Sequence, residues 1–245
     1  MGNLYGWIGD FEKSIDYYYA SREIFEELNS LRNVAQSYLE LGWMHFNIDN
    51  NKSKELIDRA IEIAKKIINP DVLGKSYNYL GTYYGYVGNY DSAIYCYENA
   101  LEICQTLQDR RGEEIAKFNL ASIYEKQGYL RQALNLYRQS ITDENHLIGV
   151  AINHYTMGQL YTKLNNYDSA GLYLYKAKSL LKEIKESSDY TALLLYLSQY
   201  HERLNDTDSA LFYYKEHVVN KIELLDAERN SRMAEMEVRF EIDQK

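Results

Sequence analysis

Apolar residues recur every three or four positions along almost the whole chain, which is the spacing of one face of an α-helix. Short polar segments rich in Asn, Asp and Gly interrupt this pattern at regular points and are typical of helix ends. The pattern predicts helices at 11–28, 31–47, 51–68, 71–87, 90–107, 110–127, 130–141, 145–164, 167–184, 188–204 and 207–242. Residues 1–9 read as the tail of an earlier helix.

The helices repeat as pairs. The sequence Asn-Tyr-Asp-Ser-Ala occurs intact at residues 89–93 and again at 166–170. The equivalent small residues are Ser14, Ser53, Ala93, Ala133, Ala170 and Ala210, at intervals of 39, 40, 40, 37 and 40 residues. A repeat of this length cannot bury its apolar faces alone, so stacking of successive pairs is expected.

Each landmark of the repeat has a physical reason. Small residues such as Gly81 and Gly158 lie where two helices cross closely, and Asn89 or Asn166 can accept a hydrogen bond from a free amide at a helix start. Aromatic residues at fixed positions are expected to fill the space between helices. These framework positions are Tyr84, Tyr90, Tyr97, Tyr124, Tyr137, Tyr161, Tyr167 and Tyr214.

The pattern Leu-Gly-x2-Tyr-x3-Gly-x-Tyr-x2-Ala-x3-Tyr-x2-Ala, complete from Leu80 to Ala100, resembles the tetratricopeptide repeat (TPR) family. The resemblance extends over nearly the whole chain and is weakest around Gly42. It implies an all-α fold, a right-handed α-α superhelical solenoid of about six TPR helix pairs with an extended C-terminal helix. We expect the TPR solenoid over residues 1–218, with a truncated first repeat, and a capping or connector helix over residues 219–245.

Composition agrees with this fold. The chain has one Pro and 26 Tyr in 245 residues, and the single Pro argues against sandwiches or barrels of many short strands. The formal charge of −9 disfavours nucleic acid as a direct ligand, because phosphate binding needs a dense basic face. The longest apolar run, Ala192–Leu197, is far shorter than the about 20 residues of a membrane helix.

The sequence shows no pattern of catalytic or metal-binding residues. Five histidines never form a pair at helical ligand spacing, and His45 and His201 occupy positions that hold Tyr in other repeats. Cys96 and Cys104 lie too far apart on one helix to form a disulfide bond. We therefore expect no catalytic residues, no metal site and no cofactor, and we expect the chain not to be an enzyme.

The first helices of the pairs are expected to line a concave groove that binds a protein or peptide partner. Rigid aromatic rings provide contact area at low entropic cost, and side-chain amides can bond a peptide backbone. For any single ring, packing between neighbouring helices is an equally good interpretation. The expected groove residues are Trp43, Phe46, Tyr79, Tyr86, Phe118, Asn119, Lys126, Tyr155, Gln159, Lys163, Tyr196, Gln199 and Arg203.

The C-terminal segment leaves several roles open. Residues 232–241 resemble the junction of bacterial TPR-containing sensor proteins, where a solenoid runs into a helical connector and an output domain. The resemblance implies the sensory or interaction region of a bacterial signalling or transcriptional regulator, as a piece of a longer protein. The location would be cytoplasmic, or periplasmic if a membrane helix follows. The alternatives are a peptide-pheromone receptor or response-regulator-binding phosphatase of the long-repeat TPR type, and a homodimer formed through residues 219–245.

Overall fold

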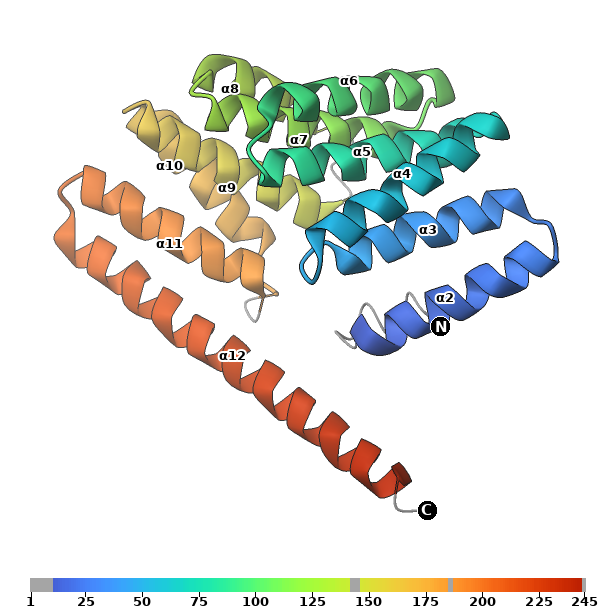
Figure 1. Cartoon of the computed structure of the whole chain (residues 1–245). Coiled ribbons are helices and arrows are strands. Elements are labelled where there is room, and N and C mark those ends of the chain that lie inside the picture. Colours follow the sequence, from blue (N-terminus) through green and yellow to red (C-terminus); the bar gives the residue numbers. More distant parts are fainter. Residues whose placement is uncertain (1–10, 142–145, 185–186, 244–245) are drawn as a thin grey trace. The chain divides into compact units, whose positions relative to one another are not determined.

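The structure is a computed structural model, and it describes residues 11–141, 146–184 and 187–243. Within these ranges it contains eleven α-helices and no strand (Figure 1). The helices are α2 (Phe11–Glu27), α3 (Leu31–His45), α4 (Asn50–Lys66), α5 (Pro70–Tyr86), α6 (Tyr90–Leu107), α7 (Arg110–Lys126), α8 (Leu130–Gln139), α9 (Leu147–Lys163), α10 (Tyr167–Leu180), α11 (Ser188–Arg203) and α12 (Thr207–Asp243). Every predicted helix in these ranges is present. The helical tail expected in residues 1–9 lies outside the described residues.

The chain divides into two compact units, Met1–Thr142 and Asp143–Lys245. In the first unit, α3 pairs with α4, α5 with α6 and α7 with α8, while α2 packs on α3; in the second, α9 pairs with α10 and α11 with α12. The first helices of successive pairs also contact one another, α3 with α5, α5 with α7, and α9 with α11. First helices therefore line one face of each unit. A single solenoid domain over residues 1–218 stays a prediction.

The links between helices combine a left-handed residue with an N-cap residue. Positive φ angles occur at Asn29, Ile68, Gly88, Gln108, Gly128, Asn165 and Asn205. At five of these links the side chain of the next residue accepts a hydrogen bond from a backbone amide at the start of the following helix, as Asn89 does from Ser92 and Asn166 from Ser169, whereas Ser30 and Tyr129 make no such bond. These predicted caps are confirmed. Such two-residue links need glycine or asparagine more than proline, which explains the single Pro of the chain.

Glycine allows close helix contact where the repeat predicts it. A Cβ atom placed on Gly81 would lie 2.7 Å from Cε1 of Tyr97 on α6, and one on Gly158 would lie 2.6 Å from Cγ of Leu174 on α10. Real Cβ atoms do not approach other carbons so closely. The small residues of the repeat are therefore needed for the packing of each helix pair.

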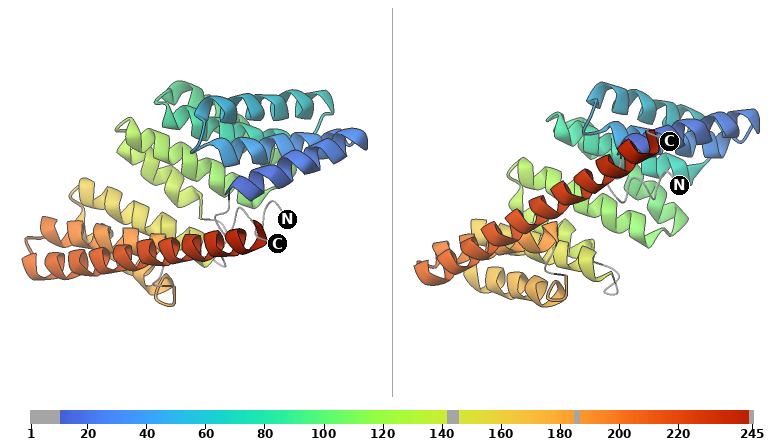
Figure 2. Two further views of the ribbon diagram at one scale, coloured as in Figure 1. Left: turned by 60° about the horizontal axis from the view of Figure 1, so that its bottom comes forward. Right: turned by 90° about the horizontal axis from the view of Figure 1, so that it is seen from below.

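The last helix differs from the earlier second helices. Figures 1 and 2 show that α12 extends well beyond the end of α11. The prediction that Tyr214 fills a space between helices is wrong, because its side chain is 51% exposed while Tyr213 is buried. In the first unit the equivalent Tyr97 packs against Leu120 and Ile123, which belong to the next first helix. No described helix follows α12, and the ring contact of Tyr214 is with His217 of the same helix, at 6.2 Å between centroids.

Helix α12 includes most of the segment that was expected to form a capping or connector helix. The helix continues without a break across residue 218, so residues 219–243 prolong the second helix of the last pair. The side chains of Met236 and Phe240, which the sequence places in a coiled-coil seam, lie outside the described residues. Within the described ranges, none of the helices combines the length and apolarity needed to cross a membrane.

Candidate functional site

Four of the expected groove residues line one hollow in the first unit, which we call the Tyr86 hollow. Phe46 of α3, Tyr86 of α5, and Asn119 and Lys126 of α7 surround a space of about 250 Å³. Gly85, which has no side chain, also lines this space. The 63% exposure of Tyr86 leaves its ring available to a ligand. The sequence pattern thus placed side chains from three first helices around one space.

A larger hollow of about 560 Å³ lies between the N-terminal halves of α3, α5 and α7, with the C-terminal half of α6 beneath. We call it the Glu40 hollow. Gly74 and Gly112, which line it, pack closely on α6: a Cβ atom on Gly74 would lie 3.0 Å from Cγ2 of Ile103, and one on Gly112 would overlap Sγ of Cys104. None of the polar residues of this hollow was among the expected groove residues. The polar lining residues are Gln36, Glu40, Asp71, Lys75, Asn78, Asp109 and Arg111.

The charges of the Glu40 hollow are not all matched by neighbours. Lys75 pairs with Asp71 at 2.9 Å, whereas the Glu40 carboxylate accepts a hydrogen bond from the neutral Gln36 amide at 2.6 Å. Burial raises the pKa of Glu40, although the Gln36 hydrogen bond and the charge of Lys75 lower it. Arg111 makes no ion pair with the described residues. The hollow therefore offers a ligand a hydrogen-bond acceptor, Glu40, and a cation, Arg111.

A pair of side-chain amides separates the two hollows. Nδ2 of Asn119 on α7 donates to Oδ1 of Asn78 on α5 at 3.0 Å, and Asn78 lines the Glu40 hollow while Asn119 lines the Tyr86 hollow. This bond leaves the Nδ2 group of Asn78 and the Oδ1 atom of Asn119 unused within the described residues. One donor and one acceptor side by side match the C=O and N–H groups of a peptide backbone.

Aromatic rings join α3 to α5 beside these hollows. The Trp43 ring lies 4.9 Å from the Tyr79 ring and 5.8 Å from the Phe46 ring, and Phe46 meets Tyr86 edge-on at 5.4 Å. Burial raises the pKa of Tyr79, and the charge of Glu40 raises it further. Packing between helices thus describes Tyr79, while Trp43 and Tyr86 have surface available for a ligand.

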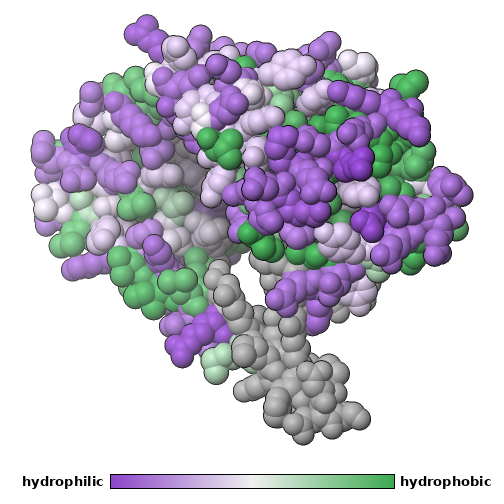
Figure 3. All heavy atoms as spheres, viewed as in Figure 1, coloured by the Kyte–Doolittle hydropathy of each residue, from purple (hydrophilic) through white to green (hydrophobic). Residues whose placement is uncertain are grey.

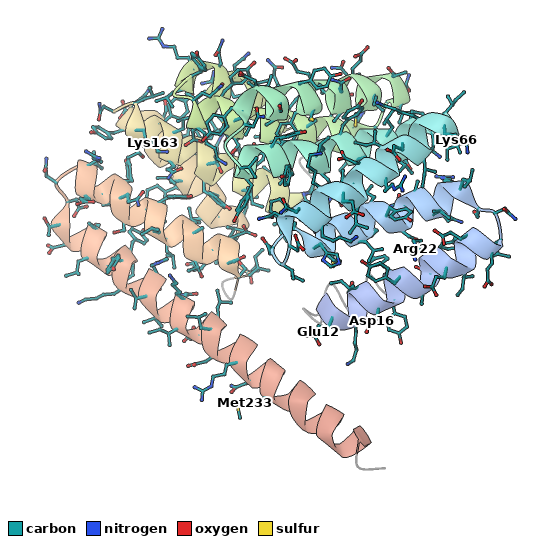
Figure 4. All side chains as sticks on the ribbon, in the orientation of Figure 1. Glu12, Asp16, Arg22, Lys66, Lys163 and Met233 are labelled. Carbon is teal, nitrogen blue, oxygen red and sulfur yellow. The ribbon has the colours of Figure 1, made fainter. Side chains whose placement is uncertain are left out.

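Five expected residues gather in a hollow of about 310 Å³ in the second unit. This Arg203 hollow is lined by Gln159 and Lys163 of α9 and by Tyr196, Gln199 and Arg203 of α11. Figure 4 labels Lys163 at the C-terminal end of α9. The lining also includes Thr162 and Glu202. Amide, basic and aromatic groups therefore occur together on the first helices of both units.

Two of the expected groove residues, Tyr155 and Phe118, contact residues of a neighbouring helix. Tyr155 is only 8% exposed, and its hydroxyl donates to Oδ1 of Asp189 at 3.0 Å, tying α9 to the first turn of α11. Burial raises the pKa of Tyr155, and the charge of Asp189 adds to this rise. Phe118 packs against Tyr137 of α8 with 5.1 Å between ring centroids. Tyr155 therefore fills space between helices and offers little surface to a ligand, while the groove role of the half-buried Phe118 stays a prediction.

The described residues contain no group of three or more side chains suited to hold a metal ion. Burial raises the pKa of both Cys96 and Cys104 to about 11, with smaller contributions from nearby charges, so neither thiol is activated as a nucleophile. His45 has no hydrogen-bond partner for either ring nitrogen within the described residues, and its ring lies edge-on to Tyr19. His45 thus packs like the Tyr that other repeats carry there.

Family models identify the repeats directly. Models described as tetratricopeptide repeat match residues 49–106, 72–142 and 152–180, which together make up half of the chain. The chain belongs to the tetratricopeptide repeat family. The TPR matches include α5, α6, α7 and α8, and therefore the amide pair and most of the Tyr86 hollow.

Solved structures with the TPR fold resemble this one at low sequence identity. The crystal structure of BtubC (BKLC) from P. vanneervenii matches with a TM-score of 0.73 and 20% identity, covering 87% of this chain and 92% of that one. A Rap protein complexed with Competence and Sporulation Factor matches with a TM-score of 0.71 and 16% identity, covering 92% and 74%. The Rap conjugation gene regulator of plasmid pLS20, in complex with the Phr* peptide, matches with a TM-score of 0.64 and 14% identity, covering 92% and 73%. A search of curated proteins found no match.

Proposed function

We propose that this chain is a non-catalytic TPR domain that binds an extended peptide segment on its first helices. The observation that carries the proposal is the Asn78–Asn119 pair, whose unused donor and acceptor lie between two hollows on the first-helix face. A peptide backbone bonded to this pair would direct side chains toward the Tyr86 and Glu40 hollows. Backbone bonding supplies affinity and the two hollows supply selectivity.

Two similar structures support a peptide as the ligand, since both were determined with a signalling factor or peptide bound. Their low identity establishes only the shared fold, so the ligand of this chain follows from its own residues. We further propose that the chain is the interaction region of a bacterial signalling or transcriptional regulator. In that role, peptide binding would change how the TPR region contacts the rest of the regulator or its target.

Matched tyrosine substitutions test the binding face. Tyr86 on first helix α5 and Tyr95 on second helix α6 are 63% and 60% exposed, so either can be replaced at similar cost to the fold. Peptides would be selected from a displayed library of random twelve-residue sequences, and their affinity measured by fluorescence anisotropy. Loss of a ring from a binding hollow costs about 1–2 kcal/mol, so Tyr86→Ala should weaken binding about tenfold.

The second helices provide the control for this experiment. Tyr95→Ala should leave the affinity unchanged. Asn78→Ala and Asn119→Ala should each weaken binding, whereas Asn135→Ala on the exposed side of α8 should not. Circular dichroism would verify that each variant keeps its helix content. Equal loss of affinity in the Tyr86→Ala and Tyr95→Ala variants would contradict the proposal, as would a library that yields no binder.

The exposed face of α12 favours a second candidate function, self-association. Val218, Ile222 and Leu225 follow one another at spacings of four and three residues and are all exposed. In the first unit the corresponding side of a second helix is covered by the next first helix. Sedimentation equilibrium tests this role: a dimer that dissociates in the Ile222→Lys variant would support it, and a strict monomer at tens of micromolar would exclude it.

A further inference from the structure

A fourth hollow lies in the second unit, away from the first-helix face. It occupies about 480 Å³ between α10, α11 and α12, and it shares no lining residue with the Arg203 hollow. Its floor consists of the buried residues Tyr190 and Leu194 of α11. In Figure 1, α10 and α12 flank α11, so the two second helices form its sides. We call it the Lys182 hollow.

Its walls are aromatic. Phe212 on α12 is 56% exposed, while Tyr213 beside it is buried, and Tyr175 on α10 faces them across the hollow. Figure 3 shows hydrophobic residues as separate patches among hydrophilic ones on the visible surface. A hollow of this size with several rings suits a flat apolar group.

One aromatic wall is fixed by a chain of hydrogen bonds. The Tyr175 hydroxyl lies 2.9 Å from Nε2 of His201, and Nδ1 of His201 lies 3.0 Å from Oδ2 of Asp206. The His201 ring also stacks on the Tyr213 ring with 5.4 Å between centroids. These contacts hold Tyr175 and Tyr213 in place before any ligand arrives, which lowers the entropic cost of binding.

The polar groups of the Lys182 hollow are mainly donors. Nζ of Lys178 donates to the Tyr213 hydroxyl at 3.0 Å and lies 4.7 Å from the centre of the same ring. The Tyr213 hydroxyl also forms a side-chain hydrogen bond with Tyr175. Lys182 and Ser179 add further donors, and Glu216 is the one carboxylate among the lining residues.

The lysines lack anionic partners. Within the described residues, neither Lys178 nor Lys182 forms an ion pair, and Glu216 lies beyond ion-pair distance of both. Both lysines lie near the C-terminal end of α10, where the helix dipole favours a cation. The dipole explains why cations are tolerated there, but it gives no reason for the aromatic hollow beside them. An external anion would pair with both ammonium groups.

We propose that the Lys182 hollow binds an aromatic anion, a ring that carries a carboxylate or phosphate group. The ring would lie against Phe212 and Tyr175, and the anionic group would accept hydrogen bonds from the ammonium groups of Lys182 and Lys178. The ligand can be a free aromatic acid or an aromatic side chain of a partner, such as phosphotyrosine. This site is independent of the peptide-binding face.

Isothermal titration calorimetry on the full chain tests the site with four probes. Phenyl phosphate and phenylacetate carry both ring and charge, inorganic phosphate carries the charge alone, and phenol carries the ring alone. We expect one of the two aromatic anions to bind at least about tenfold more tightly than inorganic phosphate or phenol. Binding of N-acetyl-phosphotyrosine amide then distinguishes a free aromatic acid from an aromatic side chain of a partner as the ligand. A site for free acids would not accommodate the backbone groups of this compound.

Neighbouring residues on the same helices provide matched control variants. Lys182→Glu should weaken binding about tenfold or more, whereas Lys176→Glu, also on α10 but outside the hollow, should change it by less than about twofold. Phe212→Ala should weaken binding similarly, and Leu211→Ala, at 50% exposure, should not. The proposal is overturned if neither aromatic anion binds the wild type at about 10 mM, if inorganic phosphate binds equally well, or if the control variants lose as much affinity.

Discussion

Two glycines on α5, one turn apart, should respond in opposite ways to replacement by alanine. Alanine in a helix interior is normally favoured over glycine by about 1 kcal/mol. At Gly81 the new Cβ would lie 2.7, 2.8 and 3.0 Å from three atoms of the Tyr97 ring. At Gly85 it would meet only the terminal Cδ1 methyl of Ile123, at 2.8 Å. The two variants therefore share the helix-propensity gain and differ in the cost of repacking.

The Tyr97 ring has little freedom to move. It is buried, and its hydroxyl lies 3.1 Å from the Thr82 hydroxyl. Burial raises the pKa of Tyr97 to about 12, although the Thr82 hydrogen bond lowers it. Overpacking at such a position costs about 1–3 kcal/mol, so Gly81→Ala should lose about 0–2 kcal/mol of stability after the propensity gain. Gly85→Ala should gain up to about 1 kcal/mol, because a terminal methyl can rotate away.

Urea unfolding followed by far-ultraviolet circular dichroism measures the difference. With a slope of about 2 kcal/mol per molar urea, the Gly81→Ala midpoint should lie about 0.5–1.5 M below that of Gly85→Ala. The wild type should lie between the two variants or level with Gly81→Ala. A Gly81→Ala midpoint at or above that of Gly85→Ala would refute the reasoning, since helix propensity alone would then explain both substitutions.

Three further predictions concern a strained turn, a buried histidine and a buried hydroxyl. Ile68 is 87% exposed with a φ of 53°, so Ile68→Gly should raise the free energy of unfolding by about 1 kcal/mol, measured by urea denaturation. Burial lowers the pKa of His45 from its usual 6.5, so the unfolded chain binds a proton at a higher pH than the folded chain does; stability should fall as the pH drops below about 6.5. His45→Tyr should reduce this loss, seen as a smaller difference in Tm between pH 8 and pH 5, and an unchanged difference would contradict it. Tyr155→Phe removes a hydrogen bond to a carboxylate and should lower stability by about 1–2 kcal/mol in urea, whereas no change would mean that the Asp189 contact contributes nothing.

The helices and their pairing could be predicted because both depend on local spacing. The side chain of each Asn cap accepts a hydrogen bond from the backbone amide three residues later, so the cap can be predicted from the local sequence. The small residues recur at the same position of each repeat. The residue with positive φ before each cap is Gly or Asn except at Ile68 and Gln108, where no sequence signal predicts a positive φ. The family identification rested on these same residues.

The groove residues could be predicted less completely than the helices. The exposure of a side chain at the edge of a helix face depends on residues far away in the sequence. Tyr155 and Tyr86 were both expected in the groove, but Asp189 on α11 captures Tyr155, and the sequence gives no sign of that contact. The Glu40 hollow was missed for a related reason. Its lining residues come from α3, α5, α6 and α7, and Gly74 and Gly112, on different helices, let α5 and α7 pack closely on α6. Such coincidences become visible only when the helices are packed together.

The central claim, that a peptide binds between the two amides on the first helices, is tested most directly by the side-chain amide signals of asparagine in ¹⁵N-correlated NMR spectra. Addition of a library-selected peptide should shift the Nδ2 signals of Asn78 and Asn119, because Nδ2 of Asn78 and Oδ1 of the Asn119 amide would bond the backbone. Signals of Asn99 and Asn135, on second helices α6 and α8, should stay in place. Shifts confined to Asn99 and Asn135, with Asn78 and Asn119 unmoved, would contradict the claim.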